Sequence, residues 1–209
     1  MDVPQSNGFS PMRQILALLI LTLTGATAMA LEEPSYEVLL TVGDVEFRRY
    51  DPYMLAEVTV DGDSQDRRAF QILAGYIFGD NNESEKMNMT APVETRGSDY
   101  AFVMERKYSR ESLPQPNDER IRIVERDGRV VAALRFSGRW SQGNIRKHEA
   151  QLVDALMGMN VETTGAAELA RYNSPFTPWF LRRNEIIVPV DWESVRAAEI
   201  IATDSPARL

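Results

Sequence analysis

The chain has 209 residues, no cysteine, a single histidine and a formal net charge of −8 at pH 7. The lack of cysteine excludes disulfides, thiolate metal sites and cysteine nucleophiles, and the acidic balance argues against nucleic acid and anionic membrane surfaces as partners. The sequence also contains no phosphate-binding loop, dinucleotide fingerprint, zinc-protease motif or nucleophile elbow. These exclusions favour a binding protein over an enzyme.

Residues 1–30 are typical of a secretory signal peptide. Arg13 precedes an apolar run from Ile15 to Leu23, and Ala28-Met29-Ala30 fits the small-residue pattern of a cleavage site. The apolar run is short for a membrane span, so an uncleaved anchor is the less favoured alternative. We expect a periplasmic or secreted protein that keeps no stable membrane span once the leader is removed.

Residues 31–192 are expected to form one α+β domain, followed over residues 193–209 by a C-terminal tail that begins with a short helix. The first half of the domain, about residues 36–108, reads as strand, strand, helix, strand, strand. These elements are strands near 45–47 and 55–60, a helix capped by Asp63 or Ser64, and strands over 87–95 and 100–105, with 36–42 as an additional strand in front. The apolar face of the helix is formed by Phe70, Leu73, Ala74 and Ile77.

The second half, about residues 119–192, repeats this plan. Asp127-Gly128 is a strong hairpin signal between strands over 121–124 and 130–136. A helix over 144–157 follows and ends at Gly158. The last strand covers 184–190, where Pro189 indicates an edge position in the sheet.

The two halves share an ordered set of matching residues. Asp51, Ala56 and Gly62 correspond to Asp127, Ala132 and Gly138, Gly79 and Asn81 correspond to Gly158 and Asn160, and residues 89–93 correspond to 172–176. We therefore predict a pseudo-two-fold repeat that forms a distorted antiparallel eight-stranded barrel, with two long helices on its outer face. A small-molecule cleft is expected where the halves meet.

His148 is the single histidine, and it lies between Ile145 and Leu152 on the apolar face of the second helix. In one interpretation it is a partly buried residue bonded to the backbone or to a carboxylate. In the other it is a metal ligand that faces a cofactor. The first interpretation is favoured because a histidine without a partner motif has little specificity.

Residues 86–93, KMNMTAPV, form the most distinctive string of the first half. The alternation of residue types places Met87 and Met89 on one face of a predicted strand. Methionine at such positions fills gaps in a core. It also suits a soft, adaptable wall for a large flat ligand, and the string alone does not separate the two interpretations.

The corresponding string of the second half, residues 171–185, is rich in aromatic side chains and arginine. Exposed aromatic residues of a loop, here Phe176 and Trp179, favour ligand binding over a place in the core. Arg182 and Arg183 can hold ligand carboxylates, or they can simply end a strand in solvent.

These strings, together with the opening YEVLLTVGDVEFRRYDPYMLAEV, resemble the SOUL haem-binding protein family over residues 33–192. The resemblance implies a pseudosymmetric α+β domain with a distorted barrel and two long helices, and a tetrapyrrole, chiefly haem, as the ligand. It further implies an apolar cleft beside the first helix. The candidate cofactor-binding residues are then Arg67, Phe70, Leu73, Ala74, Ile77, Met87, Met89, Phe176 and Trp179. No axial ligand carries over, because the first half has no histidine and His148 lies in the second helix.

The leading interpretation is an exported haem-binding or tetrapyrrole-binding protein that transports or sequesters its ligand without catalysis. One alternative is a general binding or sensor domain for hydrophobic small molecules. Another is a hydrolase or dechelatase that acts on the bound ligand through a carboxylate such as Glu105 or Glu185. A further alternative is an interaction module that uses residues 176–180 as its contact surface.

Overall fold

The computed structural model describes residues 31–61 and 65–204. The predicted signal peptide, the predicted helix cap at Asp63 or Ser64, Gly62 and residues 205–209 lie outside the described residues. The elements in chain order are β1 (Tyr36–Val42), β2 (Val45–Tyr50), β3 (Tyr53–Thr59), α2 (Gln65–Ile77), β4 (Val93–Arg96), β5 (Asp99–Val103), β6 (Ile121–Arg126), β7 (Arg129–Phe136), α3 (Gln142–Gly158), β8 (Glu168–Arg171), the 3₁₀ turn η1 (Trp179–Leu181), β9 (Asn184–Pro189) and α4 (Trp192–Asp204).

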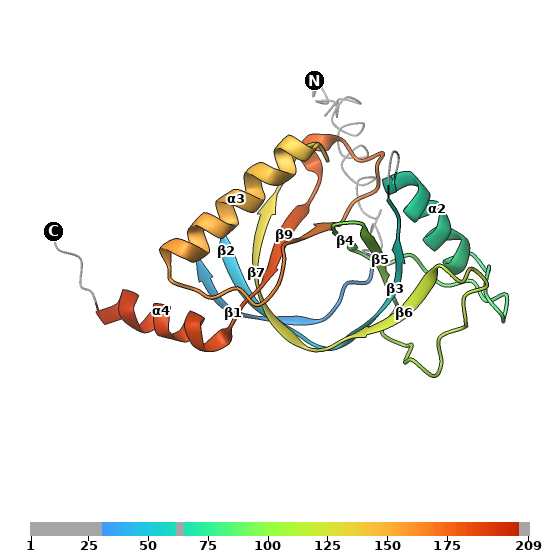
Figure 1. The fold of residues 1–209 in the computed structure, drawn as a ribbon, viewed down its shortest axis with the longest axis horizontal. Coiled ribbons are helices and arrows are strands. Elements are labelled where there is room, and N and C mark those ends of the chain that lie inside the picture. Colours follow the sequence, from blue (N-terminus) through green and yellow to red (C-terminus); the bar gives the residue numbers. More distant parts are fainter. Residues whose placement is uncertain (1–30, 62–64, 205–209) are drawn as a thin grey trace, which may run out of the picture. The chain divides into compact units, whose positions relative to one another are not determined.

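The nine strands form one curled antiparallel sheet with the order β1-β2-β7-β9-β8-β4-β5-β3-β6 (Figure 1). This arrangement confirms the predicted α+β class. The predicted barrel of eight strands is corrected in two ways. β1 pairs with β2 and adds a ninth strand, and among the described residues the end strands β1 and β6 do not pair with each other, so the sheet is a half-barrel.

Strand pairing interlocks the two predicted halves. β2 of the first half pairs with β7 of the second, and β6 of the second half pairs with β3 of the first. The halves also meet at β4 and β8. One part of the predicted alignment is wrong, because Pro92 precedes β4 whereas its assigned counterpart Pro175 follows β8. The internal repeat itself stays a prediction.

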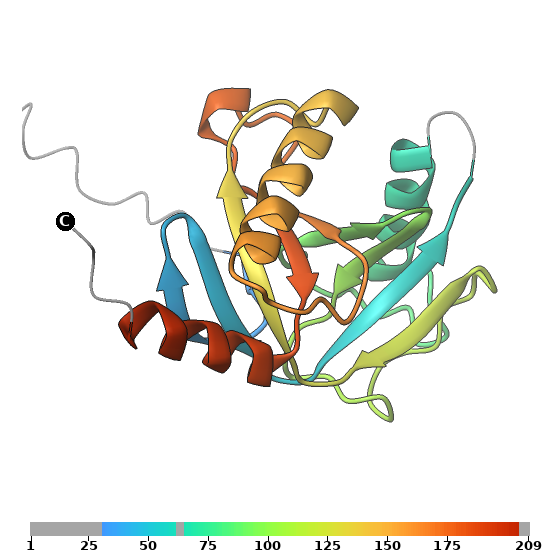
Figure 2. The same cartoon turned by 60° about the vertical axis from the view of Figure 1, so that its left-hand side comes forward.

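Helices α2 and α3 cover one face of this sheet (Figure 2). α2 lies on β3 and β5, while α3 lies on β7 and β9. Val93 is paired with Phe102 on one side and with Arg171 on the other, and paired residues share a face of the sheet. Each helix has its own apolar core, with Met54, Ala56, Leu73, Tyr76, Phe102 and others under α2, and Phe47, Ala132, Leu134, Leu152, Leu156, Ile186 and others under α3.

The buried face of α2 is rotated relative to the predicted one. Ala69, Leu73, Tyr76 and Ile77 are the buried residues of this helix. Phe70, which was expected on the same apolar face as Leu73 and Ile77, is 45% exposed. Its ring lies at the edge of the core instead, in T-shaped contact with the ring of Phe102 at 5.4 Å between centroids.

Two strand predictions are also corrected. Residues 87–92 do not form a strand, because regular pairing begins only at Val93. β9 is an interior strand between β7 and β8, so Pro189 does not mark a sheet edge. Proline is tolerated here because it occupies the last position of the strand. The second helix begins at Gln142, where the Ser141 side chain accepts a hydrogen bond from the Asn144 amide.

The opposite face of the sheet is the inside of the curl. Side chains from strands that are far apart in the sheet order meet there, as Arg129 of β7 and Tyr53 of β3 do. The apolar residues on this face are mostly small or aromatic, and they are Tyr50, Tyr53, Leu55, Ala91, Ala101, Val103, Val131, Ala133, Ala170, Tyr172 and Ile187. Two clusters of buried charges lie among them.

The first cluster surrounds Glu185, which is fully buried. Its carboxylate accepts two hydrogen bonds from Arg48, at 2.7 and 3.2 Å, one from Arg183 at 2.9 Å and one from the Tyr172 hydroxyl at 3.0 Å. Burial alone raises the pKa of a carboxyl group, but the hydrogen bonds and charges of Arg48 and Arg183 outweigh it and lower the pKa of Glu185.

The second cluster contains two glutamates that share one arginine. Arg126 Nη1 lies 2.9 Å from both Glu94 and Glu168, and Arg129 donates two further hydrogen bonds to Glu168, at 2.9 and 2.7 Å. Glu94 also accepts from the Tyr53 hydroxyl at 2.8 Å. Burial raises the pKa of Glu94. Burial acts on Glu168 too, but hydrogen bonds from Arg129 outweigh it and lower the pKa of Glu168.

Candidate functional site

A cleft of about 560 Å³ opens on the helix-covered face, beside α2 and above the seam between β4 and β8. This volume lies within the usual range of small-molecule sites. The apolar lining residues are Phe70, Leu73, Val93, Phe102, Trp140 and Pro175, and the polar ones are Asp66, Arg67, Gln71, Tyr100, Arg171 and Asn173. Residues of both predicted halves therefore contribute to one cavity, as expected for a cleft where the halves meet.

Trp140 forms the wall of the cleft that comes from the second half. It precedes the cap of α3, and its indole Nε1 donates to Asn184 Oδ1 at 2.6 Å. The guanidinium carbon of Arg182 lies 4.3 Å from the centroid of the indole ring. These contacts fix the orientation of a large aromatic surface that faces α2 across the cleft.

Arg171 provides a buried positive charge at the cleft. Its side chain is only 10% exposed. Nη1 donates to Asp66 at 3.3 Å and Nη2 donates to the Thr95 hydroxyl at 2.7 Å, but the buried Nε has no hydrogen-bond partner among the described residues. Arg171 nevertheless lines the apolar cleft, and an arginine in this position is suited to an anionic group of a ligand, since arginine binds carboxylates strongly.

Asp66 and Tyr100 complete the polar side of the cleft. Asp66 lies in the first turn of α2, where a negative charge is favoured, and it accepts a hydrogen bond from the Tyr100 hydroxyl. Burial, followed by the hydrogen bond to Asp66, raises the pKa of Tyr100 to about 12. The phenol therefore stays protonated at neutral pH, which makes it a hydrogen-bond donor and a poor iron ligand.

The predicted site residues are only partly brought together. Arg67, Phe70 and Leu73 line the cleft. Ala74 follows them on α2 without lining it, and Ile77 is buried in the core under this helix. Met87 and Met89 also pack into that core. This position agrees with the interpretation in which the methionines of residues 86–93 fill gaps in the core. Phe176 and Trp179 lie on a surface loop beyond the cleft, where they are 95% and 48% exposed.

The two arginines that were expected to hold ligand carboxylates are engaged inside the protein. Arg183 pairs with Glu33 and with the buried Glu185. Arg182 donates from Nε to the Thr177 carbonyl and from Nη2 to the Pro175 carbonyl. The arginine of this string that lines the cleft is Arg171, at its start.

Sequence reasoning misses Trp140, Tyr100 and Arg171 as site residues. No local motif marks them, because they come from three separate elements and converge only when β4 pairs with β8. A weak signal exists for Trp140, a large aromatic residue directly before the serine cap of a helix.

The contacts of His148 agree with the favoured interpretation, in which it is a partly buried residue bonded to the backbone. Its ring stacks on Phe136 at 4.1 Å between centroids, and Nδ1 lies 2.7 Å from the Asn144 carbonyl oxygen. It is not among the residues that line the cleft. Within residues 31–61 and 65–204, no three histidine or acidic side chains group together in a way that could hold a metal ion.

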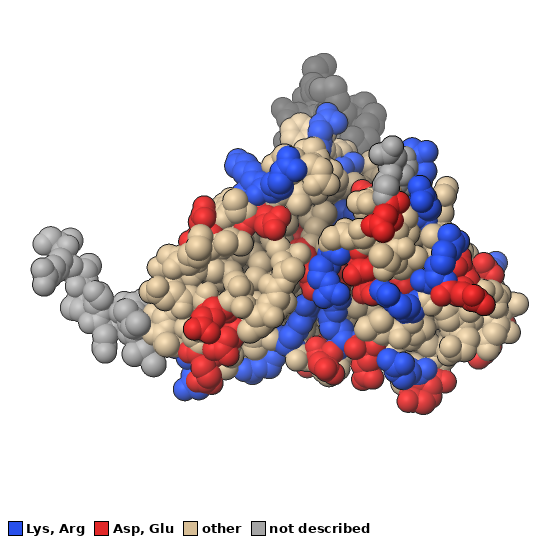
Figure 3. Space-filling view, in the orientation of Figure 1, with Lys and Arg blue, Asp and Glu red and all other residues tan. Residues whose placement is uncertain are grey.

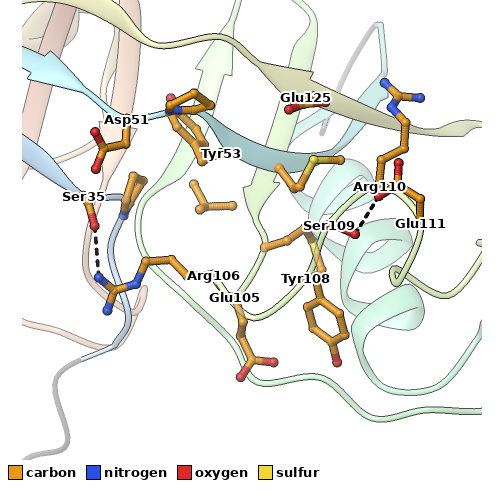
Figure 4. Close-up of a pocket in the computed structure, with 15 residues that line it drawn as sticks. Ser35, Asp51, Tyr53, Glu105, Arg106, Tyr108, Ser109, Arg110, Glu111 and Glu125 are labelled. Carbon is orange, nitrogen blue, oxygen red and sulfur yellow. Dashed lines mark hydrogen bonds between the residues drawn. The ribbon is translucent and has the colours of Figure 1, made fainter.

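A second cavity, of about 440 Å³, differs in character (Figure 4). Its labelled side chains are mostly polar and include Asp51, Glu105, Arg106, Glu111 and Glu125. Arg106 donates to the Ser35 hydroxyl there at 3.0 Å. Glu105, one of the two carboxylates considered for catalysis, lines this cavity, and Glu185, the other, is enclosed by Arg48 and Arg183. Neither lines the cleft beside α2.

None of the helices in the described part of the chain is both long enough and apolar enough to cross a membrane.

Known proteins with similar folds were found among solved structures. The C-terminal domain of EcmrR superposes with a TM-score of 0.55 at 10% identity, over 75% of this chain and 98% of that domain. A structure described as a hydrolase from Listeria innocua superposes with a TM-score of 0.50 at 12% identity, over 71% of this chain and 92% of the other. At these identities the likeness concerns the fold alone. EcmrR has also been solved in complex with DNA, and the expected lack of nucleic-acid binding stays a prediction.

Similar sequences point in a more specific direction. Heme-binding protein 1 of Mus musculus is 29% identical over 131 residues, which cover 57% of this chain and 68% of the mouse protein. Heme-binding protein 1 of Sus scrofa is 27% identical over 130 residues, with the same coverage. The sequence profile described as SOUL heme-binding protein matches residues 31–189, which is most of the chain. The chain therefore belongs to the SOUL heme-binding protein family.

Proposed function

We propose that the cleft between α2 and Trp140 binds haem or a related tetrapyrrole, and that the protein carries or sequesters this ligand without chemical change. Family membership supports haem as a possible ligand. The single observation that carries the assignment to this cleft is a largely buried arginine, Arg171, that lines a cavity with apolar and aromatic walls. A tetrapyrrole with carboxylate side chains presents the same combination of a flat apolar body and an anionic edge.

The residues of the cleft suit both parts of such a ligand, its flat apolar body and its anionic edge. Phe70, Phe102 and Trp140 offer aromatic surface for the macrocycle. Arg171 is the buried partner for a carboxylate, and Arg67 lies on the exposed wall formed by α2. When bound, haem supplies an iron centre and its redox chemistry. The chain itself binds and orients the macrocycle and excludes water from it.

The lining residues include no histidine, methionine or cysteine. We therefore infer that affinity comes from apolar contact and from the carboxylate anchor, with little contribution from the iron. His148 has no role as an axial ligand in this proposal. The metal-free porphyrin should accordingly bind about as tightly as haem.

The test is a titration of the purified protein with haemin, followed through the Soret band. We expect a saturable shift at micromolar protein, and its absence would refute the proposal. In Arg171→Gln, haemin affinity should fall about tenfold, because a charge-assisted hydrogen bond to the carboxylate is lost. Haemin dimethyl ester is the matched control, since its carboxylates are masked. It should bind the unchanged protein and Arg171→Gln equally well.

A general pocket for hydrophobic small molecules is the second candidate, and the lack of an iron-ligating side chain in the cleft favours it. It predicts that uncharged, non-tetrapyrrole hydrophobes of similar size compete with haemin at comparable concentrations. A catalytic role finds no support in the carboxylates first considered for it, since Glu105 and Glu185 lie outside the cleft.

We also propose that the protein is exported, to the periplasm or the medium, by cleavage after Ala30. The support is the composition of residues 1–30, a basic residue followed by an apolar run and a small-residue cleavage pattern. The N-terminal sequence of the protein isolated from its host tests this proposal, and a chain that retains residues 1–30 would contradict it.

The two halves are, we infer, a true repeat with its axis between β4 and β8. With β1 set aside, the sheet order reads alike from both ends, as β2-β7-β9-β8 and β6-β3-β5-β4. Strand pairing also places Glu94 and Glu168 at corresponding positions. Glu94 of β4 is opposite Ala101 of β5, and Glu168 of β8 is opposite Ile187 of β9. An alignment of many relatives that failed to superpose the halves would contradict this inference.

A further inference from the structure

The loop from Asn173 to Arg183 holds an unusual group of apolar side chains in solvent. Phe176, Trp179, Phe180 and Leu181 are 95%, 48%, 59% and 65% exposed. Large exposed apolar residues elsewhere in the described part of the chain are spread over several elements, whereas these four fall within six positions. A cluster of this kind on the surface of a water-soluble domain marks an interaction site.

The loop is built to keep these side chains outside. Arg182 donates to the backbone carbonyls of Thr177 and Pro175, and the Gly138 amide donates to the Trp179 carbonyl at 3.0 Å. Arg183 N donates to the Asn173 side chain at 2.6 Å. The backbone is thus tied down from both ends, and the exposure of the apolar residues is a fixed property of its conformation.

The charges around the loop differ from those of the whole chain. Arg135, Arg139, Arg146 and Lys147 surround the end of β7 and the first turns of α3, and none has an acidic partner within the described residues. The guanidinium of Arg139 lies 5.8 Å from the ring of Trp179. Blue side chains gather over the N-terminal end of α3 in Figure 3. Asp44 and Glu46 line a cavity together with Arg135 and Phe180, and Glu46 already pairs with Arg48. Glu149 follows Arg146 and Lys147 on α3, and Glu185, opposite Arg135 in the sheet, is enclosed by Arg48 and Arg183.

We propose that this loop is a membrane-contact surface that inserts its aromatic and leucine side chains into the interfacial region of an anionic lipid bilayer. The loop protrudes, as the almost complete exposure of Phe176 indicates, so it suits a soft surface better than a rigid partner, which would need a matching pocket. Tryptophan and phenylalanine flanked by arginine and lysine are the residues that favour membrane interfaces. The net charge of −8 opposes uniform attraction to such a surface and would orient the protein with this end toward it.

The position of the loop gives the contact a purpose. Asn173 and Pro175, at the start of the loop, line the cleft, and Trp140, which lines it too, stacks with Arg182 of the loop. A lipophilic ligand could therefore pass between the bilayer and the cleft over a short path. Membrane contact itself does not depend on the proposed tetrapyrrole binding, and it is tested without any ligand.

The experiment measures binding of protein expressed from the full sequence to phosphatidylcholine vesicles made with or without phosphatidylglycerol. We expect binding to the anionic vesicles that weakens with salt, and a loss of about tenfold or more in Phe176→Ser/Phe180→Ser/Leu181→Ser, because the inserted apolar area is removed. Phe78→Ser is the matched control, since Phe78 is 64% exposed at the far end of α2, and it should bind as the unchanged protein does.

A second measurement reports on the loop directly. Acyl chains that carry bromine should quench tryptophan fluorescence in the unchanged protein, and most of this quenching should be lost in Trp179→Phe. Equal vesicle binding by the triple variant, or quenching that does not depend on Trp179, would overturn the proposal. Self-association that disappears in the triple variant, seen by light scattering, would also overturn it by making a second copy of the chain the occupant.

Discussion

Buried arginines on the two faces of the sheet are used in different ways. Inside the curl, Arg48 and Arg183 converge on Glu185, whose carboxylate is satisfied by four hydrogen bonds from protein groups. On the helix-covered face, Arg171 lies beside a cavity with its Nε unmatched. Arg129, inside the curl, also has an unmatched Nε, but both its other nitrogens bind Glu168. What distinguishes Arg171 is therefore that it lines a cavity, whereas the arginines inside the curl are enclosed with their carboxylate partners.

The largest expected effect comes from breaking the inner face. Glu185→Gln leaves Arg48 and Arg183 without their shared carboxylate, so we expect the free energy of unfolding to fall by about 3–5 kcal/mol. Urea denaturation measures this change. Glu46→Gln is the matched control, because Glu46 contacts the same Arg48 but is partly exposed, and it should cost less than about 1 kcal/mol. Similar losses for the two variants would contradict the distinction between the faces.

The two glutamates that share Arg126 should respond to pH in opposite directions. The lowered pKa values of Glu168 and Glu185 stabilise the fold above their ordinary value of 4.5, and this stability is lost as the pH falls below it. The raised pKa of Glu94 has the reverse effect, since its ionisation costs stability as the pH rises above 4.5.

At neutral pH, Glu94→Gln should therefore destabilise the protein less than Glu168→Gln, by at least about 1 kcal/mol. Thermal or urea unfolding of both variants between acidic and neutral pH measures the difference. The stability of Glu94→Gln relative to the unchanged protein should increase as the pH rises above 4.5. A decrease over that range would show that Glu94 is held as a carboxylate like its neighbour.

On the outer face, a change in the cleft should affect the ligand more than the fold. Phe70→Ser removes an aromatic wall that is already 45% exposed, so we expect a stability loss below about 1 kcal/mol. Haemin affinity should fall about tenfold, which corresponds to the loss of one aromatic contact with the macrocycle. Absorbance titration gives the affinity and urea denaturation the stability. A large loss of stability with unchanged haemin affinity would contradict the assignment of ligand binding to the helix-covered face.

The smallest expected effect is at His148. His148→Ala should leave the spectrum of the haemin complex unchanged, because this side chain packs on Phe136 and does not line the cleft. Loss of the stacked contact should cost about 1 kcal/mol of stability. Disappearance of the shifted Soret band in this variant would restore the interpretation of His148 as an axial ligand.

Local patterns in the sequence predict the elements well where one rule dominates. Gly79 takes the expected positive φ, 111°, after α2. The hairpin predicted at Asp127-Gly128 is wrong, because this turn joins β6 and β7 but β6 pairs with β3, while β7 pairs with β2 and β9. Residues 87–92 show where such patterns fail. Their alternation resembles a strand, but Met87 and Met89 alternate because they fill the core under α2, and strand pairing begins only at Val93.

The cleft was harder to predict because its key residues meet through long-range pairing. Helical spacing places Phe70 on one face with Leu73 and Ile77, whereas in the structure Ile77 is buried in the core and Phe70 lines the cleft. Arg171 comes close to Asp66 only through the packing of α2 on a sheet in which β8 pairs with β4. Family resemblance located the cleft beside the first helix, which no periodicity in the sequence could do.

The exchange of strands between the two halves has a consequence for how the chain can be divided. β2 pairs with β7, β3 with β6 and β4 with β8, so a cut in the exposed turn at Arg110 and Glu111 would produce two fragments that each lose these three strand pairings. Neither fragment should behave as an independent domain. Mixed together, they should reassemble by fragment complementation into a working binding protein, and a single fragment at high concentration should instead form an intertwined dimer of identical halves.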